Sequence, residues 1–106
     1  MRYKEIIKLK EMLDNNSEVD IDFVFVFVKK ADGYHICSAD FSIANWKGWS
    51  VIESEYSYGA DKDLLEIAGE ILTDNEEIYD GFNVVGNVSA EEAYRRIIKY
   101  EKNRRI

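Results

Sequence analysis

Hydrophobic and polar residues alternate along residues 19–28, which read V-D-I-D-F-V-F-V-F-V. A period of two is typical of a β-strand, whose successive side chains point to opposite faces. In the first half Asp20 and Asp22 leave one face polar, whereas in the second half phenylalanines lie on one face and valines on the other. Because both faces of that half are apolar, we predict a strand that is covered on both sides and central in its sheet.

The pattern changes to a helical period at both ends of the chain. Residues 2–14 place Ile6 and Leu9 at helical spacing within an apolar stripe, which predicts an amphipathic helix. Near the other end Ser89 and Glu92 match a capping box, in which each side chain satisfies the backbone N–H of the other residue. We therefore predict a helix that begins after Ser89.

Two further alternating segments, residues 34–44 and 49–56, follow the first strand. Each is separated from its predecessor by a short turn-forming segment that contains glycine, which predicts a three-stranded antiparallel meander. Residues 61–72 place Leu64, Ile67 and Ile71 at helical spacing, and this spacing predicts a helix that packs on the sheet.

Residues 82–88 alternate weakly and give a possible short fourth strand, and a single helical turn is possible over 76–80. The predicted fold class is α+β, with residues 1–106 as a single domain. Its elements are an N-terminal helix, a three-stranded antiparallel meander, and then two helices with the possible fourth strand between them.

The cysteine content and the hydropathy of the sequence indicate where the protein works. The single cysteine, Cys37, has no partner for an internal disulfide, so the fold needs no oxidising compartment. The sequence contains no long apolar run and no signal-peptide pattern at its start. We expect a cytoplasmic protein with no membrane contact and no cofactor.

The net charge of −7 is unevenly distributed. Residues 53–92 contain one basic and twelve acidic side chains, whereas residues 93–106 contain six basic and one acidic. A segment this acidic repels nucleic acid and attracts basic protein surfaces. Acidic surface also confers solubility by itself, and that alternative stays open at this stage.

His35 and Cys37 lie two residues apart on one strand face, the spacing of a Cys–His pair. A nucleophilic cysteine needs a base oriented by a third group, and a structural zinc site needs four ligands. The chain offers neither, so we interpret the two as packed strand residues. The carboxylates of 61–63 and 74–77 lack the spacing of a calcium loop. We therefore expect no enzymatic activity, no catalytic residues and no metal site.

The expected partner-binding residues are the acidic side chains between 53 and 80 and two tryptophans of the meander, because aromatic residues are favoured at interfaces. They are Glu53, Glu55, Asp61, Asp63, Glu66, Glu70, Asp74, Glu76, Glu77, Asp80, Trp46 and Trp49. If any residues contact nucleic acid directly, we expect them to be the C-terminal arginines. These are Arg95, Arg96, Arg104 and Arg105.

The order of the predicted elements and the charge distribution resemble those of small phage-encoded inhibitors of the anti-CRISPR type. The matching parts are the helix of 2–14, the three predicted strands and the acidic run of 53–92. The resemblance includes no motif. It implies a non-enzymatic inhibitor whose acidic surface docks on a basic, nucleic-acid-binding site of a partner such as a CRISPR nuclease.

Two alternatives fit the same observations. One is an immunity protein or antitoxin that neutralises a basic toxin by the same electrostatic attraction. The other is a homodimeric structural or regulatory module that associates through Val24, Val26, Val28 and the aromatic cluster of the meander.

Overall fold

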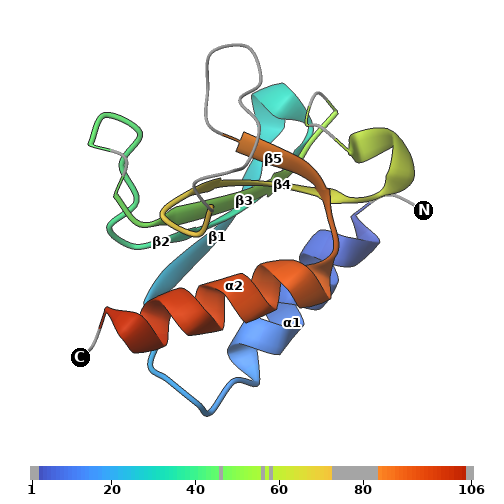
Figure 1. Cartoon of the computed structure of the whole chain (residues 1–106). Coiled ribbons are helices and arrows are strands. Elements are labelled where there is room, and N and C mark those ends of the chain that lie inside the picture. Colours follow the sequence, from blue (N-terminus) through green and yellow to red (C-terminus); the bar gives the residue numbers. More distant parts are fainter. Residues whose placement is uncertain (1–2, 46, 56, 58, 73–83, 105–106) are drawn as a thin grey trace.

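Five strands form one antiparallel sheet in the part of the chain that the structure describes, residues 3–45, 47–55, 57, 59–72 and 84–104 of a computed structural model (Figure 1). Their order in the sheet is their order in the sequence, so each strand pairs with the next. They are β1 (Phe23–Val28), β2 (Gly33–Ser38), β3 (Trp49–Glu53), β4 (Leu65–Gly69) and β5 (Val84–Val88).

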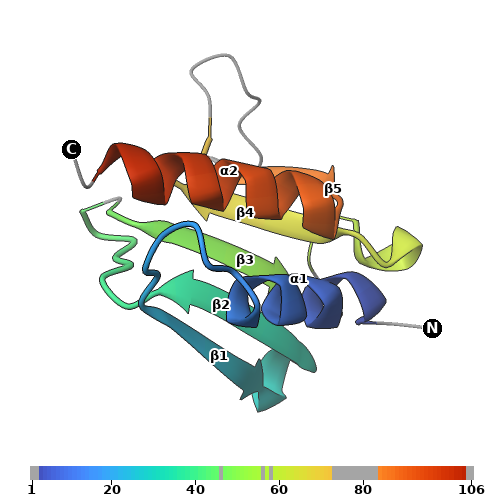
Figure 2. The ribbon, with the colours of Figure 1, turned by 90° about the horizontal axis from the view of Figure 1, so that it is seen from below.

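Two helices, α1 (Lys4–Asp14) and α2 (Ala90–Asn103), pack side by side on one face of this sheet (Figure 2). Neither covers the opposite face. Single 3-10 turns, η1 (Lys29–Ala31) and η2 (Ala60–Lys62), follow β1 and precede β4. None of the helices in the described ranges is long and apolar enough to span a lipid bilayer.

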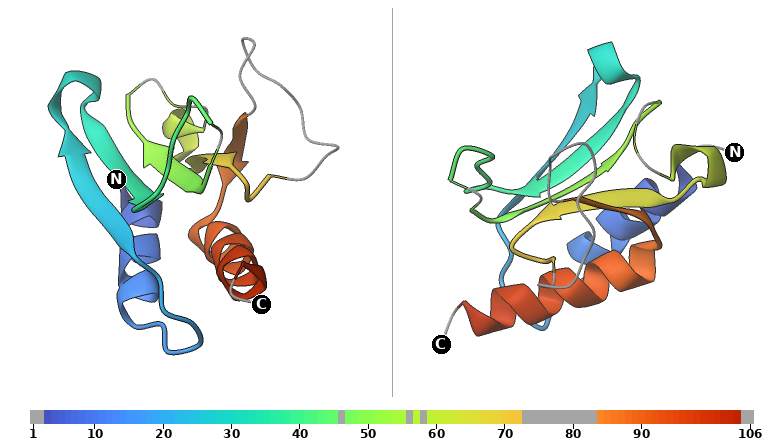
Figure 3. Two further views of the ribbon diagram at one scale, coloured as in Figure 1. Left: turned by 90° about the vertical axis from the view of Figure 1, so that its left-hand side faces the viewer. Right: turned by 45° about the horizontal axis from the view of Figure 1, so that its top comes forward.

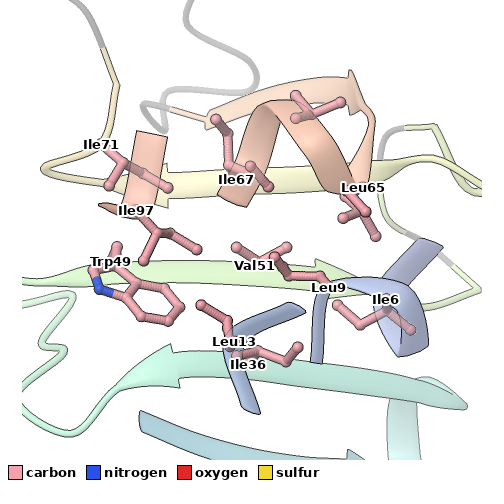
Figure 4. Packing of buried hydrophobic residues seen from close by; sticks show 13 residues of the cluster. Ile6, Leu9, Leu13, Ile36, Trp49, Val51, Leu65, Ile67, Ile71 and Ile97 are labelled. Atoms are coloured by element: carbon pink, nitrogen blue, oxygen red, sulfur yellow. The ribbon is translucent and has the colours of Figure 1, made fainter. Parts of the chain in front are cut away.

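The hydrophobic core lies between the sheet and the two helices. Ile6 and Leu9 of α1 and Ile97 of α2 are completely buried against Val51 and Ile67 of the sheet (Figure 4). Alternate strand residues point into this layer, as the pleat requires. The core thus joins elements from both ends of the chain.

A buried hydrogen bond links the middle of the sheet to α2. The indole Nε1–H of Trp49 donates to Glu101 Oε2 at 2.9 Å, and both side chains are about 1% exposed or less. Arg104 Nε lies 3.2 Å from the other carboxylate oxygen of Glu101. A buried carboxylate is tolerated only where donors surround it, so this contact constrains the position of α2 on the sheet.

The predicted fold class is wrong in its element count, since the described chain has five strands and two helices instead of three strands and three helices. The helix predicted over residues 61–72 is η2 followed by β4. Leu65 and Ile67 point into the core while Glu66 lies on the other face. Asp63 and Gly69 take positive φ angles, which an α-helix excludes. Gly69 also approaches Gly48 so closely that a Cβ would lie 2.4 Å from its carbonyl oxygen.

The position predicted for the first strand is also wrong. β1 begins at Phe23 and lies at the edge of the sheet, with β2 as its only neighbour among the described strands. Its valines are not covered, because Val24 and Val26 keep 43% and 42% of their surface exposed. Apolar residues on both faces therefore did not indicate a central strand in this protein.

Other expectations are confirmed. The helix predicted over 2–14 is α1, and the possible fourth strand is β5, which pairs with β4. Ser89 caps α2 by accepting from the Glu92 backbone N–H at 3.2 Å. The other half of the predicted capping box differs, because the Glu92 carboxylate binds Arg96 instead of the Ser89 N–H. The helical turn proposed over 76–80 lies outside the described residues.

Replacing Trp49 by Phe should lower the free energy of unfolding by about 2 kcal/mol or more, because the Glu101 carboxylate stays buried without its indole donor. Urea denaturation measures the loss. The double variant Trp49→Phe/Glu101→Leu removes both partners and should recover part of it. A double variant less stable than Trp49→Phe alone would contradict this account of the pair.

Candidate functional site

The acidic residues predicted to form one docking surface are placed in several different environments. Glu55 and Asp61 are exposed at the β3 end near η2, whereas Glu53 is only 1% exposed. Glu66 is half-buried on the open face of β4. Trp46, Asp74, Glu76, Glu77, Asp80 and Arg105 lie outside the described residues.

Glu53 and Asp63 hold the N-terminus of α1. Tyr3, the residue before this helix, has a φ of 70° and offers no side-chain cap. The Tyr3 backbone N–H donates to Glu53 Oε2 at 3.3 Å, and the Lys4 N–H donates to the Asp63 carboxylate at 3.1 Å. These two carboxylates thus replace the missing cap and complement the positive end of the helix dipole.

The environment of Glu53 also favours its protonated form. Burial of Glu53, followed by its hydrogen bond to Asp63, raises the pKa of Glu53 to about 7. The negative charge of Asp63 adds to this effect by repelling an ionised Glu53. The pair is therefore a structural element of the folded chain and is not part of an exposed docking surface.

Three other acids of the segment bind groups of their own chain. Glu70 accepts from the Gly48 N–H at 2.7 Å and from the Tyr100 hydroxyl, and these two donors lower its pKa. Glu91 pairs with Lys8 at 2.8 Å, and Glu92 pairs with Arg96 at 2.9 Å. Together with Glu53 and Asp63, five described acids of the segment therefore bind groups of their own chain.

The C-terminal arginines are also engaged. Arg96 is 18% exposed and donates to the Ile71 carbonyl oxygen at 3.0 Å, and Arg104 lies 3.2 Å from Asp40. Arg95 is 73% exposed, with Glu92 at 3.6 Å. Arg95, Arg96 and Lys99 line a shallow hollow of about 310 Å³ beside α2, together with Glu70. This surface carries both signs of charge.

Of the two tryptophans predicted to contact a partner, the one that the structure describes is buried. Trp49 is 0% exposed and bound to Glu101, so it belongs to the core and is not available on the surface.

His35 and Cys37 lie on the open face of β2. His35 Nε2 is 2.7 Å from Ser50 Oγ, and its ring meets Phe41 edge-on. Burial lowers the pKa of His35 and raises the pKa of the Cys37 thiol, so the neutral form of each is favoured. No group of three metal-binding side chains occurs among the described residues. The arrangement offers neither an activated thiolate nor a ligand set.

The helices leave one side of the sheet open, and the sequence indicated this surface only in part, through the valines named for the homodimer alternative. It consists of Val24 and Val26 of β1, Ile52 of β3, and Ala68 and Val84 of the last two strands, together with the polar residues His35, Cys37, Ser50 and Glu66. The apolar alternation that marks β1 in the sequence was the available signal. It was interpreted as burial on both faces.

Comparison of this chain with known proteins gave no match, whether with family models, with curated proteins or with solved structures. The resemblance in element order to anti-CRISPR inhibitors depended on acidic helices after the meander. That order is absent from the described chain, which has β4 where the first of those helices was expected.

The raised pKa of Glu53 makes the free energy of unfolding depend on pH. The folded-state pKa of about 7 exceeds the ordinary value of 4.5, so this contribution is complete below pH 4.5 and is lost as pH rises towards 7. Relative to Glu53→Gln, the wild-type free energy of unfolding should fall by up to about 1.4 kcal/mol per pH unit in that window. Urea denaturation at several pH values measures this difference.

Glu55→Gln, an exposed substitution two residues away, is the matched control. Its stability should follow the wild-type pH curve. A Glu53→Gln curve parallel to the wild type between pH 4.5 and 7 would contradict the raised pKa of Glu53.

Proposed function

We propose that the protein is a non-enzymatic inhibitor that binds another protein, and that residues 53–92 dock on a basic, nucleic-acid-binding site of that partner. A CRISPR nuclease is one partner of this kind. The observation that carries the proposal is the charge of the segment, twelve acidic side chains against one basic. Such a field attracts a surface that has evolved to hold phosphates.

Because several of the described acids make internal contacts, we propose a smaller set of docking residues. Glu53, Asp63, Glu70, Glu91 and Glu92 bind their own chain, and Glu66 is half-buried on the open face of β4. Among the described acids of this segment, Glu55 and Asp61 are left as exposed side chains in strand ends and turns. The remaining acids of the set are Asp74, Glu76, Glu77 and Asp80 of residues 73–83, a stretch that contains no basic side chain.

A binding role without catalysis is supported by the state of His35 and Cys37. His35 is engaged with Ser50, and burial disfavours both the imidazolium and the thiolate. A thiol in this state is a poor nucleophile.

Capture of a partner from a bacterial lysate should weaken steeply with salt and with charge reversal, because exposed charges attract through screened Coulomb forces. The tagged wild type is compared with Glu55→Lys/Asp61→Lys and with Glu76→Lys/Glu77→Lys. We expect at least one of these variants to bind the partner about tenfold more weakly or worse. The partner should be a basic, nucleic-acid-handling protein, identified by mass spectrometry.

Glu11→Lys/Glu18→Lys is the matched control, because it changes net charge equally at exposed positions outside the segment. It loses one surface ion pair, between Glu18 and Lys102, which contributes little to stability. The control should retain most of the capture. Equal loss in all three variants, or capture that is insensitive to salt, would contradict docking through residues 53–92.

His35→Ala/Cys37→Ser should inhibit the captured partner as well as the wild type does, since neither side chain takes part in the proposed contact. The assay is the partner's nucleic-acid binding or cleavage with increasing amounts of each protein. A folded double variant that no longer inhibits would contradict the non-enzymatic mechanism.

A further inference from the structure

The outer edge of β1 leaves a row of backbone groups without partners among the described residues. The Ala39 N–H donates to the Asp22 carbonyl at 2.9 Å, which makes these two residues a hydrogen-bonded pair of the antiparallel ladder. Such pairs recur at every second residue. The backbone groups of Phe23, Phe25 and Phe27 therefore point away from β2, towards the free edge. Figure 3 shows β1 at this edge of the sheet.

This edge has none of the features by which proteins usually block strand pairing. β1 consists of six residues, three phenylalanines and three valines, with no proline and no charge. It is a regular strand paired with β2 over its whole length, without a register shift. An exposed, apolar and regular edge of this kind is a template for another strand.

Both faces next to the edge are apolar and partly uncovered. On the open side Val24 and Val26 are 43% and 42% exposed, and on the helix side Phe27 is 51% exposed. Tyr34 packs against Phe25 and Phe27 with ring centroids 5.2 and 5.1 Å apart, so the aromatic residues are already ordered. A strand placed here would bury side chains on both faces and would not have to order them first.

We infer that β1 pairs antiparallel with β1 of a second copy of this chain, with the two Phe25 residues opposite each other. In this register Phe23 lies opposite Phe27 of the second copy and Val24 lies opposite Val26. The residues whose backbone N–H and C=O groups point to the free edge then lie opposite one another in the two copies. An antiparallel ladder requires this arrangement for its hydrogen bonds. The two sheets then form one continuous sheet, with all four helices on the same side.

The charges that flank β1 favour a second copy in this orientation. Asp22 precedes the strand and Lys29 and Lys30 follow it, and all three side chains are exposed. Antiparallel pairing brings the acidic end of one strand to the basic end of the other, whereas parallel pairing would bring like charges together. The edge is thus complementary to itself in both hydrophobicity and charge. This inference does not depend on the proposed function.

Sedimentation equilibrium from micromolar to sub-millimolar protein tests the inference directly. We expect a concentration-dependent shift from the monomer mass to twice that mass. A wild-type protein that stays monomeric across the range overturns the inference, and so does a fixed mass larger than a dimer.

Two double variants test the register. Val24→Lys/Val26→Lys places lysine opposite lysine twice, so the dimer dissociation constant should rise about tenfold or more. Val24→Lys/Val26→Glu changes the same two exposed positions but places lysine opposite glutamate, and it should remain dimeric. Equal loss of the dimer in both variants overturns the register, because parallel pairing would oppose like charges in each.

Cross-linking keeps the inference testable if a charged variant does not fold. Residues 24 and 26 of the two copies form a non-hydrogen-bonded pair with Cα atoms about 4.5 Å apart, which suits a disulfide. On mild oxidation a mixture of Val24→Cys/Cys37→Ser and Val26→Cys/Cys37→Ser should form a mixed disulfide dimer. Each protein alone should cross-link much less. Equal cross-linking of the mixture and of the separate proteins overturns the pairing.

Discussion

A carboxylate removed from water must be met by donors or by a proton, and this requirement determines where both helices lie. Glu53 is buried beneath the N-terminus of α1, and Glu101 is buried between α2 and the indole of Trp49. Because an unpaired buried charge costs several kcal/mol, α1 and α2 cannot move off the sheet without exposing these groups or losing their donors. The apolar core fills the layer that these two contacts define.

Because both helices pack on one face of the sheet, they leave its opposite face and the edge at β1 uncovered. The valines of β1 and the His35–Ser50 pair lie on the open face, and β1 itself forms the edge. The rings of Phe25, Phe27 and Tyr34 pack against one another at this edge. Among the described strands the most apolar one is therefore also the most exposed, which is the physical basis for the pairing that we infer.

Because several carboxylates bind groups of their own chain, the acidic segment offers a partner less negative charge than its composition suggests. Glu53, Asp63 and Glu70 accept hydrogen bonds from backbone N–H groups, so part of the negative charge has a structural role in the fold. The basic end of the chain is used in the same way, since Arg96 and Arg104 bind Ile71 and Asp40. A count of charges along the sequence overestimates the charge available to a partner when such contacts are present.

The sequence by itself determined the elements whose signals are local. These are α1 from its apolar stripe, the Ser89 cap of α2, and the strands up to β3 from their alternation. Residues 65–69 fit both a helical and a strand period. They form β4 because they pair with the edge of β3 and because Gly69 approaches Gly48 closely. Likewise, alternation predicts that β1 is a strand but does not say which strands lie beside it. Tertiary structure decided its edge position and the burial of Glu53 and Trp49, because these depend on residues that are distant in sequence.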